Sequence, residues 1–290
     1  MKTRVLSGFI MLPLLVVVYF GGYVLDAACL VLSILGVREF YNAFTNANSS
    51  ESGKKQVSQP IRPLISVAVI CTIFLYATTL FLNTSFIVMW LFLTVALSFL
   101  CMFRTKKHDV RDAFVTLIGN VYVVFFLFHV VLIGYYFQIE SGWVQGMKNP
   151  VWLVLFTAFG TDIFAYFAGV ALGKHKLCPN ISPKKTVEGS IGGILGSTLL
   201  CGVFGYFFLP HLFIHCIFIG IFGSIFSQVG DLTASAIKRK LGIKDYGRLI
   251  PGHGGILDRF DSVLYTAPFV FYYLNIYNSI VILQFQAGAL

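Results

Sequence analysis

Long uncharged apolar runs constrain this chain more than any other feature of its sequence. A helix needs about 20 apolar residues to cross the hydrocarbon core of a bilayer, which is about 30 Å thick. The 290 residues are 57% hydrophobic and 11% charged, and runs of that length recur along the chain. We therefore predict an all-α, polytopic integral membrane protein with about nine transmembrane helices. The expected spans are 6–25, 27–45, 63–82, 86–103, 114–137, 151–173, 190–208, 211–230 and 262–284.

The first two expected spans each contain a feature that suggests another interpretation. The N-terminal run follows Lys2 and Arg4, as in a signal peptide, but it continues to Leu25 without a clear small-residue cleavage site. We therefore expect a retained first span. The second span is interrupted by Arg38 and Glu39, so an interfacial or partly buried helix is the alternative there.

The distribution of cations predicts the orientation in the membrane. Cytoplasmic loops of membrane proteins collect Lys and Arg. If the N-terminus is cytoplasmic, only Lys148 of the 21 Lys and Arg falls on the outer side. This segregation requires an odd number of spans and puts the C-terminus outside. The net charge of +9 then reflects topology, and no nucleic-acid partner is expected. A compact chain with little soluble extension is expected in a bacterial inner membrane.

The polar features lie mainly in the second half of the chain. Residues 1–150 are nearly pure span and short loop, and we expect them to be a membrane scaffold that faces lipid and a dimer partner. Residues 151–290 are the expected catalytic membrane domain. The six cysteines are scattered and form no C-x-x-C pair, so neither a zinc site nor a disulfide framework is indicated.

The most polar long segment is 231–261. It contains four of the 12 acidic residues and six of the 21 Lys and Arg. Asp231, Ser235 and Lys238 are spaced i, i+4 and i+7, so one helix face would carry a carboxylate, a hydroxyl and a cation. This mixture suits metal-assisted phosphate chemistry, although a solvated loop could also carry charges of both signs.

A glycine-rich turn follows within the same segment. Gly254 and Gly255, with the residues just before them, would let the backbone approach a bulky anion closely. His253 in this turn is either a phosphate donor and general acid or a structural residue.

Four carboxylates are candidate metal ligands. Asp258 and Asp261 lie three residues apart at the start of the last span and, with Asp231, would hold a divalent cation. Arg259 lies between the first two and could pair with one of them. Asp162 is the only acidic residue well inside an expected span, where charge is costly and usually functional. The alternative for Asp162 is a helix-packing carboxylate that is bonded to a neighbouring hydroxyl.

The loop 173–193 is a second candidate for phosphate binding. Lys184 and Lys185 stand beside the hydroxyls of Ser182 and Thr186, just before a glycine-rich helix start. Such a combination makes a phosphate cradle. Lysine pairs are also expected in cytoplasmic loops from topology alone, so this pattern by itself leaves both interpretations open.

Taken together, these residues resemble the signature of the phosphatidate cytidylyltransferase family, also called CDP-diacylglycerol synthases. The resemblance covers about 150 to 262, whereas the first half is similar only in length and hydropathy. Upstream matches include Asp162 with Tyr166 and Gly169, and the run Ser182-Pro183-Lys184-Lys185-Thr186. The signature itself is the run Ser235-x-x-Lys238-Arg239-(four residues)-Lys244-Asp245-x-Gly247-x-x-Ile250-Pro251-x-His253-Gly254-Gly255-Ile256-x-Asp258-Arg259-Phe260-Asp261.

The resemblance implies a nucleotidyltransferase of phospholipid biosynthesis. CTP and phosphatidate would give CDP-diacylglycerol and pyrophosphate, with Mg2+ and room for a second cation, in a homodimer embedded in membrane lipid. The active site would face the cytoplasm and be formed by three converging pieces of the chain. Metal ligands would be Asp231, Asp258, Asp261 and Asp162. Catalytic residues would be Asp231, Asp258, Lys238, Arg239, Lys244 and His253. Substrate would be bound by Ser182, Lys184, Lys185, Thr186, Ser235, Gly254 and Gly255.

Three other functions are weighed against this one. A CTP-dependent lipid kinase acting on dolichol or phytol would transfer the γ-phosphoryl group instead. A transporter predicts polar residues spread through several spans at mid-depth, whereas here they gather at one boundary. A purely structural membrane scaffold leaves the segment 231–261 unexplained.

Overall fold

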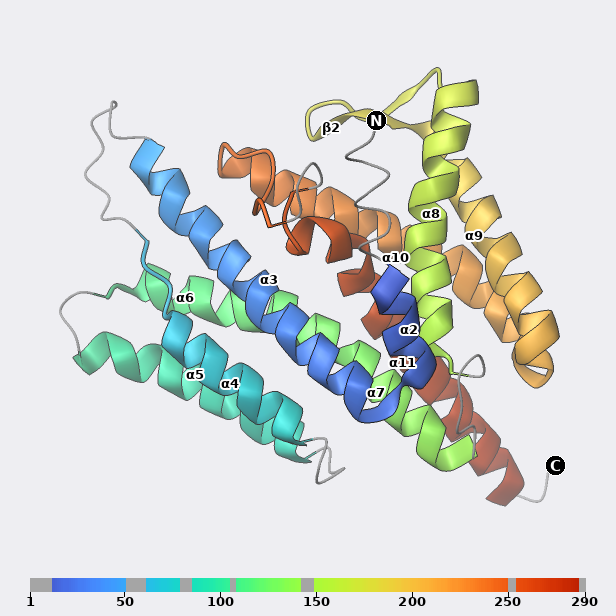
Figure 1. Cartoon of the computed structure of the whole chain (residues 1–290), viewed down its shortest axis with the longest axis horizontal. Coiled ribbons are helices and arrows are strands. Elements are labelled where there is room, and N and C mark those ends of the chain that lie inside the picture. The colour runs from blue at the N-terminus through green and yellow to red at the C-terminus, as the bar shows by residue number, and fades with distance from the viewer. Residues whose placement is uncertain are drawn as a thin grey trace. The chain divides into compact units, whose positions relative to one another are not determined.

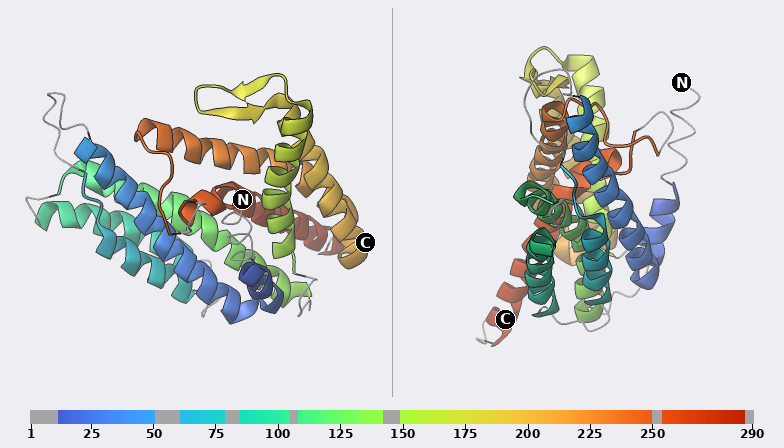
Figure 2. Two further views of the ribbon diagram at one scale, coloured as in Figure 1. Left: turned by 45° about the horizontal axis from the view of Figure 1, so that its top comes forward. Right: turned by 90° about the vertical axis from the view of Figure 1, so that its left-hand side faces the viewer.

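The computed structural model describes residues 12–50, 61–78, 85–104, 108–141, 149–249 and 254–286. Nearly all of them are helical (Figures 1 and 2). The elements are α2 Leu12–Phe20, α3 Gly22–Ser50, α4 Ile65–Ala77, α5 Ser85–Arg104, α6 Val110–Gly119, η2 Asn120–Phe125, α7 Phe126–Ser141, α8 Val151–Leu172, β1 Lys176–Cys178, β2 Ser182–Thr186, α9 Val187–Phe208, η4 Pro210–Leu212, α10 Phe213–Lys240 and α11 Leu257–Gln286.

The helical membrane class predicted from hydropathy is confirmed. Within the described ranges, five helical stretches are long and apolar enough to cross a membrane. They are Val110–Tyr135, Val151–Leu172, Val187–Phe208, Pro210–Lys240 and Leu257–Gln284. The count of nine spans and the sides of the two termini stay predictions.

The helix boundaries near the N-terminus differ from the expected spans 6–25 and 27–45. Helix α2 ends at Phe20, and α3 starts at Gly22 and continues through Arg38 and Glu39 to Ser50. Gly21 and Gly22 have positive φ angles of 59° and 48°, which interrupt a right-handed helix. The hydropathy pattern does not predict this break, because the residues on both sides of it are apolar.

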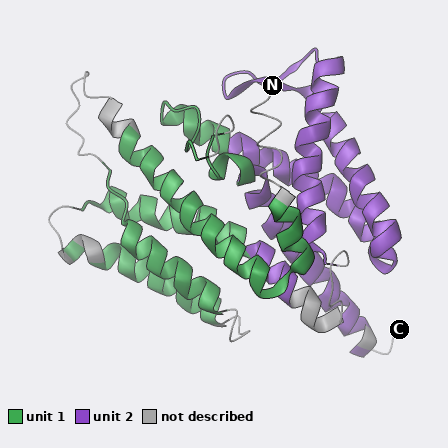
Figure 3. Ribbon diagram, viewed as in Figure 1, with its two compact units in different colours: residues 1–128, 234–260 green, residues 129–233, 261–290 purple. Residues whose placement is uncertain are grey.

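The chain forms two compact units (Figure 3). One comprises 1–128 and 234–260, and the other comprises 129–233 and 261–290. Segment 234–260, which holds most of the signature, therefore belongs with the N-terminal helices. The functional division at residue 150 stays a prediction.

In the first unit, a buried polar network fixes α3 against α6 and η2. The fully buried Tyr41 donates its hydroxyl to the Thr116 carbonyl oxygen at 2.7 Å. Asn120 Nδ2 donates to the Tyr41 hydroxyl at 3.2 Å and to the same carbonyl at 3.0 Å. Buried polar groups are costly unless they are bonded, so this network favours one arrangement of the helices. It holds the part of α3 that carries Glu39.

In the second unit, α8 and α9 pack closely because glycines line the contact. A methyl group on Gly189 would lie 2.8 Å from the Ala165 carbonyl oxygen, and one on Gly193 would lie 2.9 Å from the Thr161 carbonyl oxygen. Small residues let helix backbones approach in this way.

A two-stranded antiparallel sheet joins α8 to α9, which the all-α prediction did not include. Strands β1 and β2 pair Lys176 with Thr186 and Cys178 with Ser182, beside the ends of the two helices (Figure 2). Thr186 also caps α9, because its hydroxyl accepts from Gly189 N at 3.1 Å. The strands are too short and polar to leave a hydropathy signal.

Candidate active site

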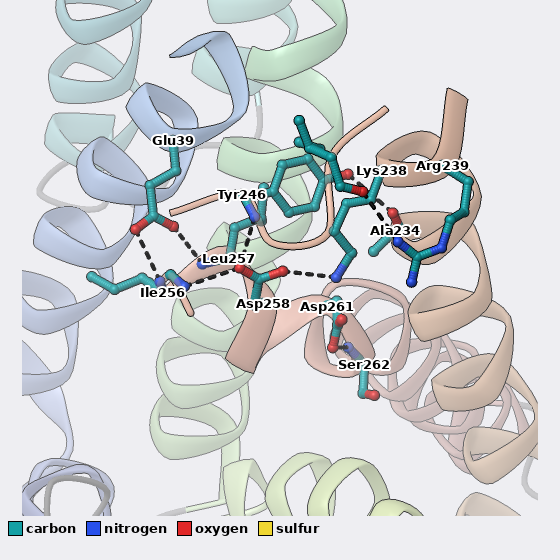
Figure 4. Close-up of polar contacts among 12 residues, drawn as sticks. Glu39, Ala234, Lys238, Arg239, Tyr246, Ile256, Leu257, Asp258, Asp261 and Ser262 are labelled. Atoms are coloured by element: carbon teal, nitrogen blue, oxygen red, sulfur yellow. Dashed lines mark hydrogen bonds and ion pairs between the residues drawn. The ribbon is translucent and has the colours of Figure 1, made fainter. Parts of the chain in front are cut away.

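The first unit contains a buried ion pair between Lys238 and Asp258. Lys238 is in the last turn of α10, and Asp258 is in the first turn of α11. Lys238 Nζ lies 2.7 Å from Asp258 Oδ1, and the two side chains are only 9% and 2% exposed (Figure 4). Buried charges of this kind must be paired, because desolvation of either one alone is costly.

The other oxygen of Asp258 organises the surrounding loop. Asp258 Oδ2 accepts from Tyr246 N at 2.8 Å and from Gly255 N at 2.9 Å. The Tyr246 ring lies 5.3 Å from Lys238 Nζ, a cation–π distance, and its hydroxyl donates to the Ala234 carbonyl oxygen at 3.3 Å. Asp258 is therefore held in one orientation by a cation and two backbone donors.

Glu39 of α3 also contacts this part of the chain, although the signature does not include it. Its Oε1 accepts from Ile256 N at 3.1 Å and its Oε2 accepts from Leu257 N at 2.9 Å (Figure 4). The sequence signal is a carboxylate in an otherwise apolar run, which by itself indicates an interrupted second span.

The second unit contains a separate ion pair between Lys185 of β2 and Asp231 of α10. Both side chains are half-buried. The loop 173–193 and the start of segment 231–261 therefore meet here. Lys184 is exposed, and Ser182 begins β2.

The remaining carboxylates of this unit lie nearby on α8 and α11. Asp162 is exposed and accepts from Ser262 Oγ at 3.1 and 3.4 Å, the hydroxyl contact that its helix-packing alternative requires. Asp261 Oδ1 accepts from Ser262 N at 2.9 Å. A methyl group on Gly230 would lie 2.6 Å from the Asp261 carbonyl oxygen, so α10 and α11 approach closely beside Asp231.

Other predicted site residues have more local contacts. Asp231, Ser235 and Lys238 all lie on α10, which confirms their expected helix. The exposed Arg239 donates to the Ile243 carbonyl oxygen at 3.1 Å. His253 lies outside the described residues.

Lys244 lines a pocket of about 570 Å³. The pocket lies between α3 and the loop after α10, and both carry polar side chains into it. Its lining residues are Asn42, Ala43, Asn46, Ile243, Lys244, Asp245, Tyr246, Gly247 and Arg248.

The suggested pairing of Arg259 with a neighbouring aspartate is not seen. Among the described residues, Arg259 makes no ion pair with Asp258 or Asp261, and its buried Nε has no hydrogen-bond partner. Asp258 forms its ion pair with Lys238 instead. Successive residues of a helix do not face each other, so adjacency in sequence does not bring Arg259 against Asp258.

The donor chemistry of the four carboxylates suits Mg2+, which prefers hard oxygen ligands. Asp258 is in one unit, whereas Asp162, Asp231 and Asp261 are in the other. Across the part of the chain that the structure describes, no three His, Cys, Asp or Glu side chains form a group that would hold a metal. Metal binding by these four residues stays a prediction.

Gly254 offers a direct test of how tightly Asp258 is enclosed. Its φ is +85°, and a methyl group there would lie 2.9 Å from Asp258 Oδ2. Gly242 has a similar φ of +69° but nothing within 4 Å. Both Ala variants should lose about 1–3 kcal/mol of stability through backbone strain. Only Gly254→Ala should also lower turnover, by at least about tenfold, because it displaces the carboxylate. Equal turnover of the two variants would contradict this.

Paired ionisable side chains in the helices of a membrane protein, such as Lys238–Asp258 and Lys185–Asp231, usually mark a functional site. This chain belongs to the cytidylyltransferase family, whose model matches residues 2–277. It is therefore a nucleotidyltransferase that uses CTP.

Its similar proteins include three bacterial relatives named phosphatidate cytidylyltransferase. The one from Synechocystis is 34% identical over 276 residues, which cover 88% of this chain and 89% of the relative. The one from Bacillus subtilis is 49% identical over 121 residues, or 41% of this chain and 45% of the relative. The one from Staphylococcus epidermidis is 39% identical over 179 residues, or 60% and 65%.

Proposed function

We propose that this membrane enzyme transfers the cytidylyl group of CTP to phosphatidate, giving CDP-diacylglycerol and pyrophosphate for phospholipid biosynthesis. The observation that carries the proposal is the match to the Synechocystis phosphatidate cytidylyltransferase over 88% of the chain. The signature residues give it physical support, because they build the buried Lys238–Asp258 cluster.

The reaction balances without a covalent enzyme intermediate. A phosphate oxygen of phosphatidate attacks the α-phosphorus of CTP, and the bond from that phosphorus to the β-phosphate oxygen breaks. Pyrophosphate leaves with the electron pair of that bond. The protein contributes mainly by positioning the two substrates and by neutralising phosphate charge.

We assign the phosphate-binding role to lysines, an arginine, hydroxyls and two glycines. Lys238 and Lys185 already have fixed ammonium groups, because Asp258 and Asp231 hold them. Fixed cations need less reorganisation than mobile ones when charge develops. The remaining members are Arg239, Lys244, Lys184, Ser182, Thr186, Ser235, Gly254 and Gly255, with His253 as a proton donor.

We assign the metal-binding role to Asp162, Asp231, Asp258 and Asp261, which would hold Mg2+ and a second cation. When bound, Mg2+ supplies charge neutralisation on the transferred phosphate groups. The carboxylates supply oxygen ligands, and their backbone and hydroxyl partners orient those oxygens.

In the membrane, we propose nine spans with a cytoplasmic N-terminus, an outer C-terminus and an active site that faces the cytoplasm. The near-complete segregation of Lys and Arg supports this topology. A bacterial inner membrane is proposed because the three relatives described above are bacterial. The homodimer is proposed from the family resemblance.

Labelled CTP separates the proposed transfer from a lipid kinase reaction. With phosphatidate and α-labelled CTP, the purified protein should place the label in lipid, whereas γ-labelled CTP should give labelled pyrophosphate. The reason is that the bond on the distal side of the α-phosphorus breaks. Boiled protein and reactions without phosphatidate are the controls. Label from γ-labelled CTP in lipid, with CDP as the other product, would contradict the proposal.

A further inference from the structure

Glu39 is a carboxylate of the N-terminal half that accepts hydrogen bonds from the signature region. It lies 217 residues before Ile256 and 218 before Leu257. We propose that Glu39 is a positioning residue for the transfer reaction, which anchors the first turn of α11 and thereby sets the orientation of Asp258. This inference rests on the proposed function.

The backbone N–H groups at the start of α11 need acceptors from outside the helix. A helix leaves its first N–H groups without partners inside the helix. The residue before α11 is Ile256, whose side chain has no acceptor. Glu39 supplies acceptors for two of these groups, Ile256 N and Leu257 N. Its negative charge also suits a helix N-terminus electrostatically.

Two glycines lie directly against the Glu39 carboxylate. Methyl groups on Gly247 or Gly255 would collide with the Glu39 carboxylate, and the nearest atoms to both positions are its own. Glycine at these positions thus leaves room for one side chain that comes from α3. The Glu39 carboxylate is enclosed by backbone on two sides as well as bonded at its two oxygens.

Consecutive backbone donors connect Glu39 to Asp258. Gly255 N donates to Asp258 Oδ2, and the next two N–H groups along the chain donate to Glu39. Three successive backbone donors are therefore divided between two carboxylates. If Glu39 is lost, Ile256 and Leu257 lose their acceptors, and the turn that presents Asp258 to Lys238 is less constrained.

Glu39→Gln is the sharpest variant, because it keeps the volume and replaces one acceptor oxygen by a donor amide. We expect hydrogen exchange at the Ile256 and Leu257 amides, measured without substrates, to become at least about tenfold faster. We expect kcat to fall about 10–100-fold with little change in the KM for CTP, as is typical when a supporting contact of an active-site ligand is lost.

A mutant cycle with Gly247→Ala tests the contact by an independent route. Gly247→Ala alone should lower kcat, because its methyl group displaces the Glu39 carboxylate. In Glu39→Ala/Gly247→Ala that collision is gone, so the double variant should be no slower than Glu39→Ala. Additive losses would overturn the proposal. The cycle also applies if Glu39→Gln folds poorly.

Exchange and turnover together distinguish the possible failures. Faster exchange with normal kcat, or a lowered melting temperature with normal kcat per folded protein, would overturn the positioning role. Unchanged exchange would overturn the anchoring contact itself. If the wild type makes no CDP-diacylglycerol, the proposed function fails and the positioning role falls with it, whereas the exchange result still reports on the contact.

Discussion

Asp258→Asn is expected to abolish CDP-diacylglycerol formation, lowering kcat by at least about 10³-fold. The substitution removes the counter-charge of the buried Lys238 ammonium, 2.7 Å away. It also leaves one oxygen where two now accept from Lys238, Tyr246 N and Gly255 N. A proposed metal ligand is lost at the same time. Steady-state kinetics on purified, membrane-extracted protein measures the effect.

Asp109→Asn is the matched control for this variant. Asp109 caps α6, where its side chain accepts from Val110 N at 2.7 Å. Asn is an equally good N-cap residue, so stability and turnover should stay close to those of the wild type. Turnover of Asp258→Asn within tenfold of this control would remove Asp258 from the catalytic set.

Lys238→Met should have the second-largest effect, on stability as well as on turnover. It leaves the Asp258 carboxylate buried without its cation, which costs about 3–5 kcal/mol when one partner of a buried pair is removed. Turnover should fall about 10²–10³-fold, because a fixed phosphate-binding cation is lost. Chemical unfolding and kinetics on the same preparations separate the two effects.

Two further variants sharpen this prediction. Lys240→Met removes an exposed cation from the same helix end and should change stability and turnover little. Lys238→Met/Asp258→Asn removes both buried charges, so it should recover part of the lost stability while turnover stays abolished. If the double variant is less stable than Lys238→Met, the two side chains do not form the pair described here.

The helices were largely predictable because apolar runs of membrane length leave a strong signal. The expected span 151–173 corresponds to α8, Val151–Leu172. Ends in polar sequence were less predictable. Helix α10 combines the expected span 211–230 with the helix expected over Asp231, Ser235 and Lys238, but hydropathy did not indicate that it ends at Lys240. The break at Gly21 was not predicted because apolar residues lie on both sides of it. The β1–β2 hairpin was not predicted because its strands are short and polar.

The candidate site was predictable where side chains carry a pattern. The signature located Lys238 and Asp258 but did not show that they pair with each other. Contacts to backbone N–H groups leave no pattern, because any residue can offer that donor. Glu39 was missed for this reason, and its partners are more than 200 residues away in sequence.

The most direct test of the central claim is pyrophosphate release by the purified protein supplied with CTP, phosphatidate and Mg2+. We predict that pyrophosphate and CDP-diacylglycerol form in equal amounts, and that omitting phosphatidate or chelating the metal stops both. No release in the presence of both substrates and Mg2+ would contradict the account.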